Sequence, residues 1–193
     1  MKNICVYCGA NTGRRAEYTA AADALAAELV ARDIGLVFGG GSIGIMGAVA
    51  DAVLARGGRV TGIIPEALAV REVPHRGLTK MHVVGSMHER KALMADLSDG
   101  FIALPGGLGT IEELFEILTW SQLGFHAKPC GLLNVAGYYR HLIAFLDHSV
   151  AEELLLPQYR HMLLEADDPA HLLRQMQDYQ APAMDHRISR EQL

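Results

Sequence analysis

Short apolar runs alternate along the chain with longer segments whose apolar positions recur at helical spacing. We predict strands at the short runs, which cover residues 4–8, 36–38, 59–64, 80–84, 100–104, 129–134 and 162–166. We predict helices at the longer segments, which cover 15–31, 43–56, 86–97, 110–123, 138–150 and the stretch that follows Pro169. Because strands that alternate with helices need crossover connections, the pattern predicts an α/β fold: a Rossmann-like three-layer α/β/α domain with a mainly parallel sheet.

The length and composition suit a single domain. A chain of 193 residues that is 50% hydrophobic can bury one substantial core, and nothing in its length requires a second. We therefore predict one domain over residues 1–179. Residues 180–193 lack periodicity, and we predict a C-terminal tail there.

The net charge and the length of the apolar runs limit the classes of partner that we expect the protein to bind. A net charge of -5 argues against a general nucleic-acid binder, because such binding depends on clustered lysine and arginine. No apolar stretch approaches the roughly 20 residues that span a bilayer, and the N-terminus lacks a signal-peptide pattern, so we expect no membrane partner and a cytoplasmic protein. Three cysteines form no disulfide framework. Cys5 and Cys8 would point to opposite faces of a strand, so we expect ordinary buried thiols.

Residues 99–121 carry the most informative pattern in the chain. An apolar run suited to a buried parallel strand ends in Pro105-Gly-Gly-Leu-Gly-Thr110, and a Glu-rich helix follows at once. Glycines let backbone N–H groups approach a ligand, and the dipole of a helix that starts near Thr110 favours negative charge. We therefore expect a phosphate-bearing ligand. Glu113 would then be an acid or base held beside it.

A second glycine-rich turn, FGGGSIGIMG at residues 38–47, also follows a predicted strand. Turns at the carboxyl ends of parallel strands lie on one side of a sheet, so we expect both turns to line one cleft. The residues that we place against the ligand from this turn are Gly40, Gly41 and Ser42. A competing interpretation is a dinucleotide fingerprint, Gly39-x-Gly41-x-x-Gly44, with Glu66 as the ribose-binding acid. That fingerprint normally opens the first βαβ unit, whereas this match follows the second strand.

Arg90 and Glu113 are the candidate chemical groups, since each lies near the start of a helix on the predicted ligand side of the sheet. Both helix starts also fit a capping box, Ser86-x-x-Glu89 and Thr110-x-x-Glu113, so Glu113 could serve only as a cap. Arg90 could be a solvated surface residue. Glu72 could be a cleft carboxylate or a loop charge. The histidines show no metal-ligand spacing, so we expect no metal and no cofactor.

Three motifs together resemble the LOG ("lonely guy") family. They are PGGxGTxxE at 105–113, MHxRK at 87–91 and GGGxxGxMG at 39–47. The segments DGFIALPGG, ELFEILTWSQLG and KPCGLLNVAGYY are also similar to that family, so the resemblance covers about residues 3–156. Members are cytokinin riboside 5'-monophosphate phosphoribohydrolases, often labelled lysine decarboxylases. The resemblance therefore implies a nucleotide-binding catalytic domain that hydrolyses the N-glycosidic bond of adenosine 5'-monophosphates, including N6-substituted ones, to the free base and ribose 5-phosphate.

The resemblance also implies residue roles and a partner. Arg90 and Glu113 would be catalytic. The residues around the nucleotide would be Glu72, Arg90, Lys91, Gly106, Gly107, Leu108, Gly109, Thr110, Ile111, Glu112 and Thr119. The family commonly has CGSS in its first loop, where this chain has Cys8-Gly-Ala-Asn11, and Asn11 or Thr12 could replace a hydroxyl contact. A homodimer with its active site near the subunit interface is implied as well. The alternative is a non-catalytic nucleotide- or cofactor-binding Rossmann-like module.

Overall fold

Seven parallel strands form one sheet in the order β4-β3-β2-β1-β5-β6-β7. The computed structural model describes residues 1–69 and 74–182. The strands are β1 (Asn3–Tyr7), β2 (Gly35–Phe38), β3 (Val60–Pro65), β4 (Lys80–Val84), β5 (Gly100–Ala103), β6 (Cys130–Leu133) and β7 (Leu163–Ala166). The chain runs outward from β1 to β4 on one side and then returns to place β5 on the other side of β1. This reversal creates a crevice at the carboxyl ends of β1 and β5, where open α/β sheets bind ligands.

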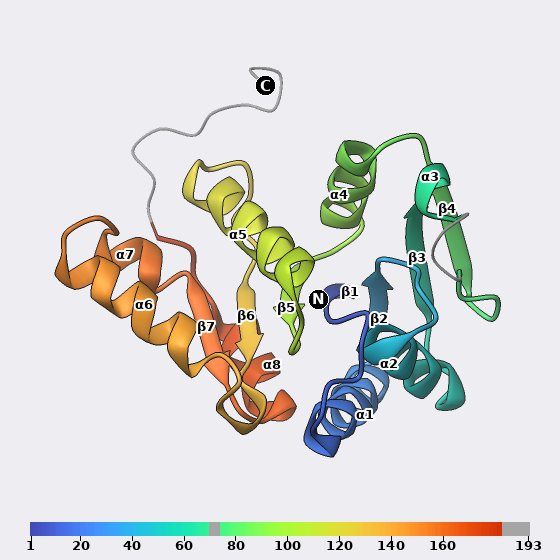
Figure 1. Ribbon diagram of the computed structural model, residues 1–193. Coiled ribbons are helices and arrows are strands. Elements are labelled where there is room, and N and C mark those ends of the chain that lie inside the picture. Colours follow the sequence, from blue (N-terminus) through green and yellow to red (C-terminus); the bar gives the residue numbers. More distant parts are fainter. Residues whose placement is uncertain (70–73, 183–193) are drawn as a thin grey trace.

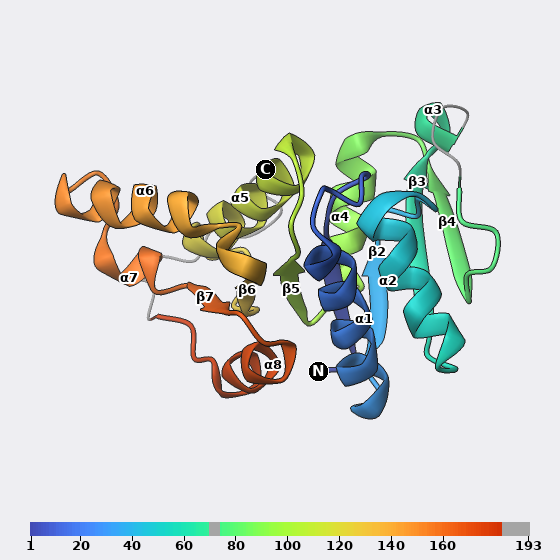
Figure 2. The same cartoon turned by 60° about the horizontal axis from the view of Figure 1, so that its bottom comes forward.

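Helices cover both faces of the sheet, as Figures 1 and 2 show. The first layer packs a core of Ile4, Val6, Leu36 and their neighbours and contains α1 (Ala16–Ala31), α2 (Gly44–Ala55) and α8 (Pro169–Asp178). The second layer packs around Cys5, Tyr7 and Phe101 and contains α4 (Met87–Asp96), α5 (Leu108–Gln122) and α6 (Arg140–Ala151). The alternation of β1 side chains between the two cores confirms the predicted three-layer α/β/α architecture.

Cys5 and Cys8 belong to different cores, and the cysteines of the chain are free thiols. This confirms the expectation of ordinary buried cysteines on opposite faces. Of the apolar residues on α5 and α6, Phe115, Trp120 and Leu142 pack against the second core, whereas Phe145 is 62% exposed. Among the described residues no helix is long and apolar enough to cross a membrane.

All seven predicted strands are confirmed within one or two residues, but three short elements were not predicted. These are α3 (Glu66–Ala69), α7 (Pro157–Arg160) and the 3-10 turn η1 (Val135–Gly137). A four-residue helix is too short to show periodicity, so the apolar pattern cannot reveal it. The last described helix ends at Asp178, and most of the predicted tail, residues 183–193, lies outside the described residues.

Candidate active site

A cavity of about 410 Å³ opens at the carboxyl ends of β1 and β5, where the strand order reverses. Its walls come from the loop after β1, the first turn of α2, the side of α4 and the segment that joins β5 to α5. The lining residues are Cys8, Gly9, Ala10, Asn11, Gly13, Tyr18, Ile45, Met46, Arg90, Pro105, Gly106, Gly107, Gly109, Thr110, Glu113 and Tyr138. The cavity therefore contains both predicted catalytic residues and most of the predicted phosphate loop.

The phosphate loop leads directly into the N-terminus of α5. Gly107 is the N-cap, and the helix begins at Leu108, two residues earlier than predicted. The first N–H groups of a helix have no partner inside it, so this terminus offers donors to an anion. At Gly107 and Gly109 an added Cβ would meet nothing within 4 Å, which leaves room for a ligand to approach the backbone. At Gly106 it would lie 2.1 Å from the Thr110 hydroxyl, so only glycine fits there.

The early start of α5 shows that Glu113 is not a helix cap. Thr110 is buried within the first turn, and Glu113 lies one turn further along. The capping alternative for Glu113 is therefore wrong. The other capping box is confirmed: the Ser86 hydroxyl accepts from the Glu89 N–H at 3.1 Å, and the Glu89 carboxylate accepts from the Gly85 N–H at 2.7 Å.

Glu113 sits partly buried in the cavity wall. Burial raises the pKa of its carboxyl to about 7, against the lowering effect of Arg90, while Glu112 adds to the rise. A carboxyl with this pKa can exchange a proton near neutral pH, as general acid–base catalysis requires.

Arg90 is buried, with only 7% of its surface exposed. One terminal nitrogen donates to the Gly39 carbonyl at 3.1 Å, which ties α4 to the loop after β2. A Cβ on Gly39 would lie 2.0 Å from that nitrogen, so the glycine makes room for the guanidinium. Within the described part of the chain, the Arg90 Nε atom has no hydrogen-bond partner. A buried, unpaired donor on a cavity wall is available to a ligand, so Arg90 is not a solvated surface residue.

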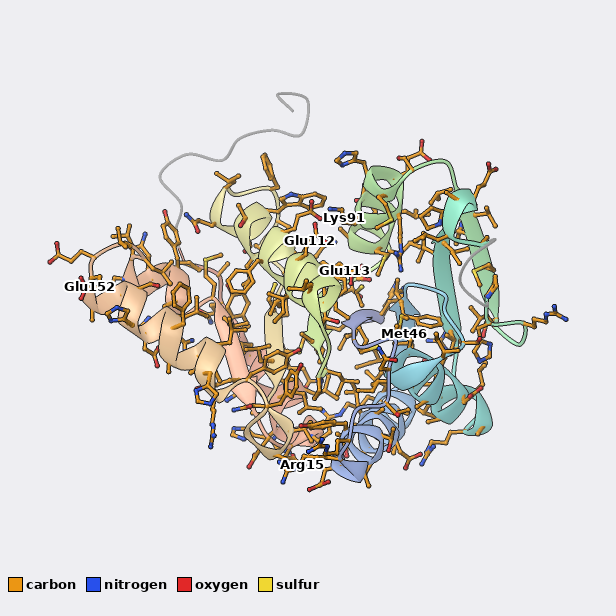
Figure 3. All side chains as sticks on the ribbon, in the orientation of Figure 1. Arg15, Met46, Lys91, Glu112, Glu113 and Glu152 are labelled. Atoms are coloured by element: carbon orange, nitrogen blue, oxygen red, sulfur yellow. The ribbon has the colours of Figure 1, made fainter. Side chains whose placement is uncertain are left out.

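Lys91 does not line the cavity, and its side chain links α4 to α5. Its amine contacts the carboxylates of Glu112 and Glu116, each at 2.8 Å. Burial alone would lower the pKa of Lys91, but these two hydrogen bonds raise it. Figure 3 shows Lys91, Glu112 and Glu113 gathered where the two helices face each other. Lys91 and Glu112, both predicted around the nucleotide, thus neutralise each other beside the cavity and do not line it.

The remaining residues that were predicted to contact the ligand lie in several parts of the structure. Gly40 and Gly41 are buried and contact residues 74–75. The His75 N–H donates to the Gly40 carbonyl at 2.9 Å, and Gly41 forms an isolated β-bridge with Pro74. The others that do not line the cavity are Ser42, Glu66, Leu108, Ile111 and Thr119. Glu72 lies outside the described residues. The structure therefore brings together Arg90, Glu113, the phosphate loop and the end of the second glycine turn, where Ile45 and Met46 line the cavity. Gly40, Gly41 and Ser42, the residues of that turn predicted to contact the ligand, do not line it.

Several cavity residues were missed or left open by sequence analysis. Of the two residues that could replace a hydroxyl contact in the first loop, Asn11 lines the cavity, whereas Thr12 does not. Burial raises the pKa of the Cys8 thiol well above its ordinary value, so this thiol remains neutral and is a poor nucleophile. Tyr138 was not predicted, and its only signal was membership of the family-like segment KPCGLLNVAGYY. Met46 was not named individually, but it lies in the second glycine turn, which was expected to line the cleft.

The cavity does not fit pyridoxal chemistry, which needs a lysine for a Schiff base. The lysines of the chain are Lys2, Lys80, Lys91 and Lys128, and all are described, yet none lines the cavity. Among the described residues no group of three or more His, Cys, Asp or Glu side chains is placed to hold a metal ion.

The fold and the cavity define a Rossmann-like α/β protein in which a loop suited to bind an anion, the Glu113 carboxyl and the Arg90 guanidinium lie in one crevice. Comparison with known proteins is consistent with this class. A family described as "possible lysine decarboxylase" matches residues 46–176. The probable cytokinin riboside 5'-monophosphate phosphoribohydrolase LOGL9 of Oryza sativa subsp. japonica is 51% identical over 93% of this chain and 79% of its own. The Arabidopsis thaliana phosphoribohydrolase LOG1 is 49% identical over 93% of this chain and 84% of its own. The chain belongs to this LOG family.

Solved structures with a similar fold include more distant proteins. The molybdenum cofactor carrier protein of Chlamydomonas reinhardtii superposes with a TM-score of 0.70 at 19% identity, over 92% of this chain and 99% of the other. The molybdenum cofactor binding protein of Rippkaea orientalis gives 0.69 at 20% identity, over 92% and 97%. At these identities the likeness shows the shared fold and nothing about ligands.

Proposed function

We propose that this protein hydrolyses the N-glycosidic bond of adenosine 5'-monophosphates, including N6-substituted ones, to the free base and ribose 5-phosphate. The observation that carries the proposal is the meeting of Glu113, Arg90 and the phosphate loop in one cavity. The names of relatives at about 50% identity support the same reaction. The names of the LOGL9 and LOG1 relatives, cytokinin riboside 5'-monophosphate phosphoribohydrolases, give the substrate as a cytokinin riboside 5'-monophosphate.

Each part of the cavity has a role in that reaction. The N–H groups at the start of α5 receive the 5'-phosphate and so fix the ribose in the cavity. As the bond between N9 and C1' breaks, its electron pair leaves with the purine and positive charge develops on the sugar. The ionised Glu113 carboxylate stabilises that charge and accepts a proton from the water whose oxygen bonds to C1'. The departing purine takes up one proton from solvent to become the neutral base, and Glu113 returns its proton to solvent, so that the reaction balances. The buried guanidinium of Arg90 orients the phosphoribosyl group and favours the ionised form of Glu113.

A product assay across nucleotides tests the proposal. The purified protein is mixed with AMP, N6-isopentenyladenosine monophosphate, GMP and CMP, and with adenosine as the unphosphorylated control. We expect free base and ribose 5-phosphate from at least one adenosine monophosphate, and turnover of adenosine at least about 100-fold slower because it lacks the anchoring charge. Binding of AMP without release of base from any nucleotide would instead support a non-catalytic binding module.

We further propose that two copies of the chain form a dimer. The family resemblance suggests it, and apolar side chains on and after α6 lack cover within one chain: Phe145 is 62% exposed, Leu154 86% and Leu156 51%. Sedimentation equilibrium should give about twice the 20.9 kDa mass of one chain. A Phe145→Asp variant should shift the protein toward monomer because it would bury a charge at the interface. A wild-type mass of one chain at micromolar concentration would contradict the proposal.

A further inference from the structure

The peptide that joins Gly106 to Gly107 is held by a single side-chain hydroxyl. Tyr138, which follows η1, donates from its hydroxyl to the Gly106 carbonyl at 2.6 Å. Glycine on both sides leaves this peptide with the least conformational restraint in the loop. Because the C=O and N–H of a trans peptide point in opposite directions, fixing the carbonyl also fixes the direction of the Gly107 N–H.

The neighbouring peptides are held in other ways. The Gly9 N–H donates to the Pro105 carbonyl at 3.1 Å, a backbone contact between two cavity loops. The Tyr139 hydroxyl donates to the Leu104 carbonyl at 2.6 Å in the buried core. The peptide from Leu104 to Pro105 ends at a proline and so has no N–H to direct. Of the two tyrosine contacts, only that of Tyr138 orients a peptide that carries an N–H donor.

Local structure holds the Tyr138 ring in place. Ala136 and Gly137 adopt left-handed backbone angles, with φ of 50° and 72°, and this turn presents two consecutive tyrosines to the loop. The Tyr138 ring meets Tyr18 edge-on at 5.5 Å between centroids and Tyr139 at 4.9 Å. With 41% of its surface exposed, Tyr138 contributes less to the core than to the cavity wall.

We propose that Tyr138 is a positioning residue for phosphate recognition. Its hydroxyl holds the peptide between Gly106 and Gly107 so that the Gly107 N–H joins the free N–H groups at the start of α5. Without the hydroxyl, this glycine-flanked peptide can rotate and present its carbonyl oxygen to the anion, which repels it. The inference rests on the proposed function only in taking the ligand to be a phosphorylated sugar.

The matched pair Tyr138→Phe and Tyr139→Phe tests the inference, because each removes one hydroxyl that donates to a carbonyl of the same loop. Calorimetry with ribose 5-phosphate is the probe. We expect the Tyr138→Phe protein to bind about tenfold more weakly, as loss of one oriented hydrogen bond predicts, and the Tyr139→Phe protein to stay within about twofold. With AMP as substrate, KM should rise in Tyr138→Phe more than kcat falls. The melting temperature should fall more in Tyr139→Phe, which leaves a buried carbonyl unpaired.

Three results would overturn the inference. They are unchanged ribose 5-phosphate affinity in a folded Tyr138→Phe protein, equal losses in both variants, and no binding of ribose 5-phosphate by the wild type. The binding measurement is independent of turnover. If ribose 5-phosphate binding depends on Tyr138 but no nucleotide is hydrolysed, the inference stands and the proposed function fails. If nucleotides are hydrolysed and the Tyr138→Phe protein binds ribose 5-phosphate as tightly as the wild type, the proposed function stands and the inference fails.

Discussion

Replacing Glu113 by glutamine should lower kcat by about 10²–10⁴-fold, the range that a positioned acid or base contributes. Glutamine has nearly the same shape but cannot ionise or accept a proton from water. Because burial raises the pKa of Glu113, the folded protein disfavours the charged carboxylate. Above pH 7 the glutamine variant should therefore be at least as stable as the wild type. Activity would be lost without loss of fold, and steady-state kinetics together with thermal unfolding measure both.

Glu112→Gln is the matched control for this variant. Glu112 neighbours Glu113 on α5, but its carboxylate is half-exposed and pairs with Lys91 outside the cavity. We expect kcat to change by no more than about threefold, because a partly exposed ion pair contributes little and neither partner of this one lines the cavity. Equal losses of kcat in the Glu113→Gln and Glu112→Gln proteins would mean that catalysis depends on the overall negative charge of α5 and not on the Glu113 carboxylate alone.

Replacing Arg90 by methionine should lower kcat/KM by at least about 100-fold and shift its pH dependence. In the wild type, kcat/KM should rise as the pH increases through about 7, because Glu113 must be ionised. Arg90 lowers the pKa of Glu113, so without the guanidinium the rise should move to higher pH. Methionine keeps much of the apolar stem. The unpaired Gly39 carbonyl should still cost about 1–3 kcal/mol of stability.

The pH profile separates this role from a structural one. A variant that is merely destabilised loses activity at every pH without moving the midpoint of the rise. An Arg90→Met protein that is folded at the assay temperature and keeps the wild-type midpoint would show that Arg90 does not act on Glu113.

The sequence predicted the architecture because strand and helix periodicities are local properties of the chain. It also identified Arg90, Glu113 and the glycine loop, since their motifs lie at consecutive positions. The start of α5 was misplaced because Gly107 and Thr110 can both serve as N-caps, and a pattern cannot choose between them. In the folded protein Gly107 is the N-cap of α5, so Glu113 has no capping role.

Contacts between distant segments could not be predicted from local patterns. Lys91 follows Arg90 in a motif that suggests anion binding, yet its partners Glu112 and Glu116 lie 21 and 25 residues away on another helix. Tyr138 contacts a carbonyl 32 residues earlier in the chain. The first pairing depends on how α4 packs beside α5, and the second depends on where the segment after η1 lies against the loop before α5. Both are properties of the tertiary fold.

The most direct test of the account is the fate of N6-isopentenyladenosine monophosphate in ¹⁸O-labelled water. Mass spectrometry of a short incubation identifies which bond breaks and where the water oxygen goes. We predict free N6-isopentenyladenine and ribose 5-phosphate with one ¹⁸O atom at C1, formed by the wild type and almost absent with Glu113→Gln. Label in inorganic phosphate with intact nucleoside, or recovery of unchanged nucleotide, would contradict N-glycosidic hydrolysis in this cavity.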